Sequence, residues 1–187
     1  MQPALWLARH GETEWTLARR HTGRTDIPLT AAGEAVARDA LARKLAGVTF
    51  DLVLSSPLRR ARDTARLAGF DPEIDDRLRE LDYGDYEGVT TADIQRERPG
   101  WDLWTDGCPG GESVEEVGAR MDALIAERLR ANGERVLVFG HGHALRILAA
   151  RWVGLPAREG RVLLLAPAAV GVMGAEHDSP AVERWGV

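Results

Sequence analysis

Short apolar runs alternate along the chain with longer stretches in which apolar residues recur at helical spacing. The apolar runs predict buried strands over residues 4–8, 51–54 and 135–139. The periodic stretches predict helices over residues 30–46, from Ser55 onward, over 112–131 and over 144–153. Strands that alternate with helices favour a mostly parallel sheet covered by helices on both faces.

The rest of the chain is less regular. Three further apolar runs near its end predict strands over residues 162–165, 170–175 and 181–185. The middle holds Trp101 and Trp104 beside the turn-rich stretch 107–111. These two indoles are candidates for a lid at the entrance of a site, or for ordinary core residues. With no linker and no repeat, residues 1–187 are expected to form one domain.

Composition narrows the class of partner. The net charge of -5 argues against sequence-independent nucleic-acid binding, which needs a basic stripe. Lys44 is the only lysine, so 23 of the 24 basic residues are arginine. A GC-rich genome explains that bias most simply, and it also means that an anion site would be built from guanidinium groups.

Nothing in the sequence points to export or to a membrane. Cys108 is the only cysteine and cannot form an internal disulfide. The apolar start, residues 1–8, is too short for a signal peptide and lacks a basic leader. No stretch approaches the roughly 20 apolar residues of a membrane span. We expect a cytoplasmic protein and no membrane partner.

Two segments share one design, in which a predicted strand runs directly into His-Gly and then toward a helix. They end in His10-Gly11 and in His141-Gly142. Ligands of open parallel sheets bind beyond the carboxyl ends of the strands, so both imidazoles are expected at one edge. Helix N-termini beside them would offer N–H groups to an anion. A lone histidine at such a place is more often structural, and the duplication makes a functional role an equal alternative.

Arg59 and Arg60 fall in the first turn of the helix that follows Ser55, where the helix dipole disfavours cations. Solvation at the surface is one interpretation of this pair. An anion held between the guanidinium groups and the helix end is the other. Arg9 places a further guanidinium directly beside His10.

Metal binding is the main competing use of the histidines, because His141 and His143 lie two residues apart. Zinc sites need three or four ligands with carboxylates behind them. Here arginines surround the histidines and would repel a cation, so we expect no metal and no other cofactor.

At these residues the sequence resembles the histidine phosphatase superfamily, also called phosphoglycerate-mutase-like. The similar stretches span residues 9–15, 22–33, 55–65, 78–88 and 141–143. Each motif alone is weak or moderate, but their combination in this order is specific. The resemblance implies an α/β fold, a three-layer α/β/α sandwich with a mixed, mainly parallel sheet.

The resemblance also implies residue roles. His10 would be the phosphorylated nucleophile, with Arg9, Arg60 and His141 on the transferring phosphoryl group and Glu80 as proton donor. Backbone contacts to phosphate would come from Gly11, Thr22, Gly23 and Gly142. A backbone carbonyl that holds Nδ1–H of His10 would leave Nε2 aimed at phosphorus.

The sequence departs from the family pattern in ways that favour a phosphatase. Thr16 stands where many members have Asn, which puts one substrate contact in doubt. The basic segment of cofactor-dependent mutases is missing, since only Arg96 and Arg98 lie between Gly84 and Gly118. Other stretches resemble sugar-bisphosphate phosphatases, and in that likeness the residues facing substrate would include His21, Tyr83, His143 and Arg146.

We therefore expect hydrolysis of a small phosphorylated metabolite, with a sugar phosphate as one candidate substrate. A cofactor-dependent phosphoglycerate mutase is the first alternative. The second is a non-catalytic module that binds a phosphorylated ligand. The sequence leaves open whether the chain forms a homo-oligomer.

Overall fold

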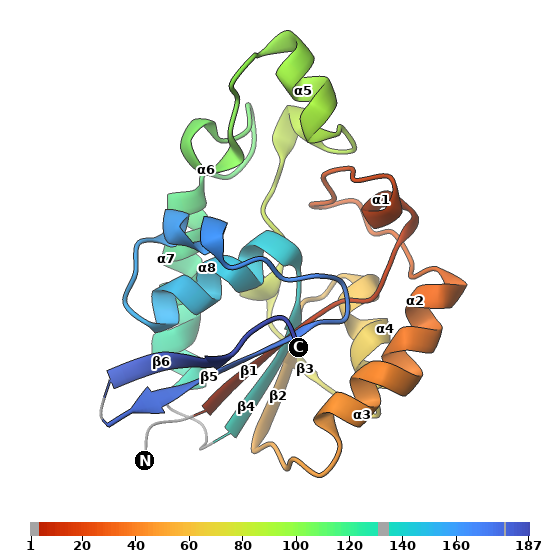
Figure 1. Cartoon of the computed structure of the whole chain (residues 1–187), viewed down its shortest axis with the longest axis vertical. Coiled ribbons are helices and arrows are strands. Elements are labelled where there is room, and N and C mark those ends of the chain that lie inside the picture. Colours follow the sequence, from red (N-terminus) through yellow and green to blue (C-terminus); the bar gives the residue numbers. More distant parts are fainter. Residues whose placement is uncertain (1–3, 131–134, 178) are drawn as a thin grey trace.

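The computed structural model describes residues 4–130, 135–177 and 179–187 (Figure 1). Within these residues one mixed sheet has six strands in the order β3-β2-β4-β1-β5-β6. The strands are β1 (Ala4–Arg9), β2 (Leu52–Ser55), β3 (Glu73–Ile74), β4 (Arg135–Gly140), β5 (Val170–Glu176) and β6 (Ser179–Arg184). Four of them, β3, β2, β4 and β1, run parallel to one another. Strand β5 runs antiparallel to β1, and β6 runs antiparallel to β5.

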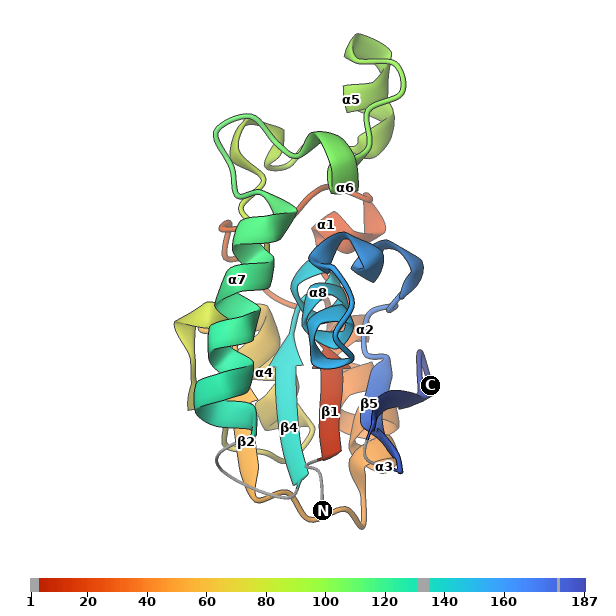
Figure 2. The same ribbon diagram turned by 90° about the vertical axis from the view of Figure 1, so that its left-hand side faces the viewer.

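Helices connect the strands and cover the sheet. On one side lie α2 (Ala31–Val36), η1 (Ala37–Leu41), α3 (Ala42–Leu45) and α4 (Arg59–Leu67). On the other lie α7 (Val114–Leu124), η4 (Ile125–Leu129) and α8 (Gly142–Trp152). Figure 2 shows α7 and α8 in front of the sheet and the orange helices behind it. This arrangement confirms the predicted helix-covered, mainly parallel sheet.

Shorter elements lie mostly beyond the carboxyl ends of the parallel strands, where Figure 1 places α1, α5 and α6. They are α1 (Glu14–Leu17), η2 (Asp76–Leu78), η3 (Gly84–Tyr86), α5 (Thr91–Glu97), α6 (Leu103–Asp106) and η5 (Ala157–Val162). Sequence periodicity did not reveal α5 or α6. Both are short helices capped at their N-termini by Thr90 and Asp102.

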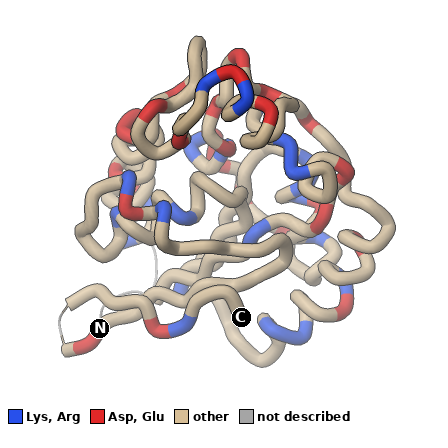
Figure 3. The backbone as a smooth tube through the Cα atoms, turned by 45° about the horizontal axis from the view of Figure 1, so that its top comes forward, with Lys and Arg blue, Asp and Glu red and all other residues tan. Residues whose placement is uncertain are grey.

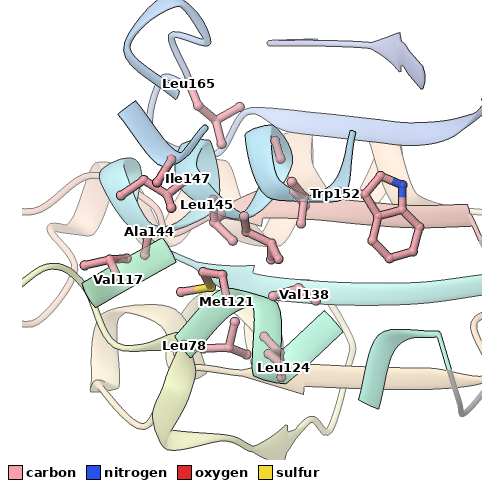
Figure 4. Packing of buried hydrophobic residues seen from close by; sticks show 14 of the residues in the cluster. Leu78, Val117, Met121, Leu124, Val138, Ala144, Leu145, Ile147, Trp152 and Leu165 are labelled. Atoms are coloured by element: carbon pink, nitrogen blue, oxygen red, sulfur yellow. The ribbon is translucent and has the colours of Figure 1, made fainter. Parts of the chain in front are cut away.

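Strand alternation divides the core into two clusters. In β1, Leu5 and Leu7 face α7 and α8, whereas Trp6 and Ala8 face α3 and α4. Figure 4 shows the first cluster, in which Met121 of α7 packs among apolar side chains of β4 and α8. Both faces of the central strands are buried, which is why these strands read as continuous apolar runs.

One predicted strand is wrong. Residues 162–165 do not join the sheet: η5 ends at Val162 and the chain then runs on without regular structure. Val162 is 62% exposed and Leu164 is 73% exposed, whereas Leu165 is buried, so only part of this apolar run enters the core. The other predicted strands and long helices lie within a few residues of their expected bounds. No helix among the described residues is long and apolar enough to cross a membrane.

Candidate active site

His10 follows β1 directly and is 3% exposed. Its Nδ1 lies 2.7 Å from the carbonyl oxygen of Gly11. A carbonyl only accepts, so Nδ1 carries the proton and Nε2 keeps its lone pair. Burial, followed by the charges of Arg9 and Arg60, holds the pKa of His10 well below its usual value. The ring is therefore neutral, with one unprotonated nitrogen available to the cavity that His10 lines.

His141 follows β4 and lies beside His10, with ring centroids 5.2 Å apart. Both of its nitrogens are engaged. Nε of Arg60 donates to Nδ1 over 3.1 Å, so Nε2 carries the proton and donates to Oγ of Ser56 over 2.7 Å. Burial and Arg60 lower the pKa of His141 well below its usual value. This second imidazole is neutral too, but its two hydrogen bonds fix its tautomer and occupy both nitrogens.

Arg60 is completely buried in the first turn of α4. Besides His141, its guanidinium donates to the backbone carbonyls of Thr22, Gly23 and Thr25 at 2.9 to 3.0 Å. These contacts use four of the five N–H groups that an arginine has. Arg60 thus ties the loop after α1 to His141, and its charge acts from behind the cavity lining.

Arg9 lines the cavity and is held differently. One terminal nitrogen donates to the carbonyl of Leu165 over 2.6 Å. Its Nε is buried and makes no hydrogen bond within the described residues. Buried N–H groups are nearly always paired, so this one is suited to an oxygen acceptor supplied by a ligand. Gly142 permits the arrangement, because a Cβ there would come within 3.2 Å of Cζ of Arg9.

Glu80 is 6% exposed, and its carboxyl group lies at the start of α8. It accepts from the backbone N–H of His143 over 3.1 Å and of Ala144 over 2.8 Å. A third donor is the N–H of Leu81, at 3.0 Å. The helix end therefore fixes a carboxyl group on the wall of the cavity, whose lining includes both Glu80 and His10.

Tyr83 and His143 form a pair on the same wall. The Tyr83 hydroxyl lies 2.6 Å from Nδ1 of His143. Burial raises the pKa of Tyr83 well above its usual value, and burial with Arg146 lowers the pKa of His143 well below its own. Both groups are therefore neutral, and one hydrogen bond joins the hydroxyl to the ring nitrogen.

Arg146 and the two middle tryptophans complete that side. The guanidinium of Arg146 lies 4.6 Å from the ring centroid of Trp104 and donates to the carbonyls of Gly160 and Arg161. Trp104 is half-buried and lies 5.3 Å from the ring of His143. Trp101 is 3% exposed and packs edge-on against His21, and with Trp104 it lines a smaller hollow beside the cavity. The lid hypothesis stays a prediction.

The cavity has a volume of about 320 Å³ and collects most of the predicted site residues. Of these it is lined by Arg9, His10, Thr16, His21, Thr22, Glu80, Tyr83, Gly142, His143 and Arg146. It is also lined by Arg19, Arg20, Thr91 and Pro167, which sequence reasoning missed. Arg19 and Arg20 directly follow α1, and adjacency to the first motif was the one available signal.

Four predicted residues do not line the cavity. Arg60 and His141 lie behind it, as described. The N–H of Gly11 donates to Oγ1 of Thr64 over 2.9 Å. The N–H of Gly23 donates to the carboxylate of Glu87, at 2.9 and 3.0 Å. A contact from either amide to phosphate would first have to displace these partners.

Several of the expected helix-end donors are occupied by side chains of the protein itself. Glu80 takes the second and third amides of α8, and Asp26 takes the Arg59 amide at the start of α4. Thr13 caps α1 through a capping box. Long-range carboxylates fill these positions, so the helix ends fix the side chains of the site more than they bind an anion.

Charge around the cavity is predominantly positive. Its lining holds four arginines, Arg9, Arg19, Arg20 and Arg146, against one carboxylate, Glu80. Over the described chain as a whole, basic and acidic positions are interspersed (Figure 3). No group of three or more His, Cys, Asp or Glu side chains that could hold a metal ion occurs among the described residues.

The model of the histidine phosphatase superfamily (branch 1) matches residues 5–187. The chain belongs to this family. It is 44% identical over 178 residues to an acid phosphatase of Mycobacterium tuberculosis, covering 92% of this chain and 87% of that protein. The sedoheptulose 1,7-bisphosphatase of Saccharomyces cerevisiae is 35% identical, with 83% and 69% covered. A probable phosphoglycerate mutase GpmB of Enterobacter is 39% identical, with 86% and 80% covered.

Solved structures of the family agree with the fold. The product of the open reading frame Rv3214 from Mycobacterium tuberculosis superposes with a TM-score of 0.93 at 39% identity, covering all of this chain and 98% of that one. The mixed, mainly parallel sheet flanked by helices is thus a histidine phosphatase fold, and the chain is a phosphatase of this superfamily.

Proposed function

We propose that the chain hydrolyses small phosphate monoesters through a phosphohistidine on His10, with Glu80 as proton donor and without a metal. The observation that carries the proposal is the state of His10. Its Nδ1 proton is held by the Gly11 carbonyl, and its unprotonated Nε2 is available to a cationic cavity. An imidazole held in that way is a competent nucleophile.

In the first step the His10 Nε2 lone pair attacks phosphorus and the ester oxygen leaves with the bonding electrons. Glu80 gives that oxygen its proton, so an alcohol departs and phospho-His10 remains. In the second step water attacks the phosphorus, and ionised Glu80 accepts a proton from the water. The N–P bond breaks, inorganic phosphate leaves, and His10 and Glu80 regain their starting states.

The loose transition state of phosphoryl transfer spreads negative charge over the equatorial oxygens, so positioning and electrostatics dominate catalysis. Arg9 supports this role with a buried Nε that no described residue bonds. The guanidinium of Arg60 adds positive charge from behind the cavity lining, and it holds His141 in one tautomer. Gly142 keeps room for the Arg9 guanidinium beside the start of α8.

The polarity of the cavity favours a leaving group with hydroxyl groups, such as a sugar. His143 keeps Nε2 for a ligand, since Tyr83 occupies its Nδ1. His21 donates through Nδ1 to the Val89 carbonyl over 2.9 Å, which leaves Nε2 as an acceptor. A hydroxyl can both donate and accept, so two such ring nitrogens suit a hydroxyl-bearing substrate, as expected for relatives such as the sedoheptulose bisphosphatase.

Mutase activity is the second candidate, because similar chains include a probable phosphoglycerate mutase. Against it, Arg96 and Arg98 do not line the cavity: Arg96 pairs with Asp93, and Arg98 donates to the Tyr86 hydroxyl. The absence of net phosphate release while 2- and 3-phosphoglycerate interconvert would decide for the mutase.

The test is a panel of phosphate esters scored by released phosphate in the presence of EDTA. Rapid quench with labelled substrate should trap acid-labile label on His10. A label on serine, or none on the protein under single-turnover conditions, would remove the nucleophile assignment. Activity that chelation abolishes and zinc or magnesium restores would contradict the metal-free mechanism.

Two sequence predictions beyond the chemistry stay predictions. Cytoplasmic localisation rests on the lone cysteine. Homo-oligomer formation stays open, and sedimentation of the purified chain would measure it.

A further inference from the structure

The cavity extends past His10 to the end of α1, where Arg19 and Arg20 meet the segment before α5. The mechanism proposed above uses neither arginine. A second hollow, of about 390 Å³, adjoins this end and is also lined by Arg19 and Thr91. Both arginine side chains are exposed, so they can reach a ligand without leaving the fold.

The two guanidinium groups carry charge that the described residues do not neutralise. Neither forms an ion pair in the described chain; Arg20 donates to the carbonyl of Gly88 over 3.3 Å. Asp93, whose charge interacts with Arg20, is paired with Arg96. With Glu80 committed to the start of α8, this end of the cavity attracts anions.

The backbone that positions Arg19 and Arg20 is strained. Arg19 has φ of +54°, in the left-handed region that disfavours a residue with a Cβ. Such a position costs about 1–3 kcal/mol and occurs often at functional sites. Arg19 N–H donates to the Thr16 carbonyl over 3.2 Å, and Arg20 forms a β-bridge with Thr90. Glycine would be unstrained at this position, where the chain instead carries an arginine.

Building on the proposed function, we propose that Arg19 and Arg20 form a subsite for a second anionic group. The preferred substrate is then a phosphate monoester that bears a further phosphate or carboxylate. The scissile phosphate binds at His10 and Arg9, and the second anion binds at the end of α1. Thr91 adds a hydroxyl at the same place.

Two substrate pairs test this, each differing by one anionic group. Fructose 6-phosphate with fructose 1,6-bisphosphate tests a second phosphate, and glycerol 3-phosphate with 3-phosphoglycerate tests a carboxylate. Wild type should favour one or both bis-anionic members in kcat/KM by about tenfold, a modest ratio because exposed guanidinium groups are screened. Raising the salt concentration should reduce that preference.

The double variant Arg19→Gln/Arg20→Gln should lose about tenfold on the favoured bis-anionic ester and change by less than about twofold on its partner. Arg43→Gln is the matched control, because Arg43 is an exposed arginine of α3 that does not line the cavity. It should leave both values unchanged.

The results separate this inference from the function beneath it. Phosphate release from the mono-anionic esters with no bis-anionic preference would overturn the subsite and leave the phosphatase mechanism intact. An equal loss on both members of a pair would likewise overturn it. Failure to release phosphate from any ester would instead overturn the proposed function.

Discussion

The two strand-His-Gly segments look alike in the sequence and differ in the structure. They are neighbours in the sheet, where β1 pairs in parallel with β4 and Arg9 lies opposite Gly140. The adjacent strand ends bring His10 and His141 together with ring centroids 5.2 Å apart. Both imidazoles are buried and neutral. Position in the sheet therefore explains their meeting, but it does not assign their roles.

Hydrogen bonding assigns the roles. His10 uses one nitrogen on the Gly11 carbonyl and leaves the other unprotonated. His141 uses both, one with Arg60 and one with Ser56. Under the proposed mechanism, the motif shared by the two segments therefore supplies a nucleophile in one segment and a positioning residue in the other. Partners from α4 and the segment before it, far away in sequence, make the difference.

The sharpest way to break this comparison is to remove each imidazole in turn. His10→Ala should lower turnover by about 10⁴-fold or more, because the variant lacks the proposed attacking atom. His141→Ala should cost less and should still form labelled phospho-His10. Rapid quench and circular dichroism on both variants measure the label and the fold. Label retained by His10→Ala would reverse the assignment.

The next largest effect concerns Glu80, the proposed proton donor to the leaving oxygen. Glu80→Gln should slow phosphorylation by about 10²- to 10⁴-fold on an alkyl phosphate. The loss should be much smaller on nitrophenyl phosphate, whose leaving anion needs no proton. Pre-steady-state burst rates are the observable, because slow hydrolysis of phospho-His10 would mask the difference in turnover.

A control is needed because Glu80 also caps α8 through the His143 and Ala144 amides. Glutamine keeps one acceptor oxygen but turns an NH₂ group toward amide donors. Unfolding of Glu80→Gln should therefore be measured alongside the rates. Equal burst-rate losses on both esters would assign Glu80 to structure and remove it from proton donation.

The buried imidazoles also predict how stability depends on pH. The pKa of His10, of His141 and of His143 is lowered in the folded chain, mainly by burial. Below the unfolded value of about 6.5 the unfolded chain binds more protons, so the stability falls as the pH falls. Each imidazole adds up to about 1.4 kcal/mol per pH unit to that slope.

Denaturant unfolding between roughly pH 6.5 and 5 would measure the slope, since most carboxylates titrate lower. Replacing His141 or His10 by Gln should each reduce it by a similar amount, because burial is common to both. A slope that His10→Gln leaves unchanged would mean that His10 is not held neutral.

Local pattern predicted much of this molecule and missed what depends on contacts between distant segments. The apolar runs located the central strands, and the motifs located His10, Arg9, Glu80 and their neighbours. The sequence predicted that a backbone carbonyl accepts from Nδ1 of His10, but it did not predict which carbonyl. Gly11 supplies it.

The sequence could not show which backbone N–H donors of the site are already bonded to carboxylates of the protein. Glu87 lies 64 positions from the Gly23 amide that it accepts from, and Asp26 lies 33 from Arg59. Neither carboxylate stands out among 29 acidic residues. The predicted strand at residues 162–165 failed for a related reason. An apolar run shows what could be buried, and here the chain leaves Val162 and Leu164 exposed.

The smallest expected effect tests the hydrogen bond that locks His141. Ser56→Ala removes the acceptor of Nε2–H in a fully buried place. An unpaired buried donor costs about 1–3 kcal/mol of stability. Turnover should fall by only about tenfold, since Arg60 still holds the other nitrogen and the effect passes through the position of His141.

Ser55→Ala is the matched control: Ser55 is equally buried, but its hydroxyl donates to the Ser56 carbonyl over 3.0 Å. It should cost similar stability and leave phosphorylation of His10 unchanged. The imidazole proton of His141, followed by NMR, gives a readout that stability alone would not move: its exchange with water should quicken in Ser56→Ala and stay slow in Ser55→Ala. Equal exchange in the two variants would show that Ser56 does not fix the tautomer, and the contrast between the two histidines would then rest on Arg60 alone.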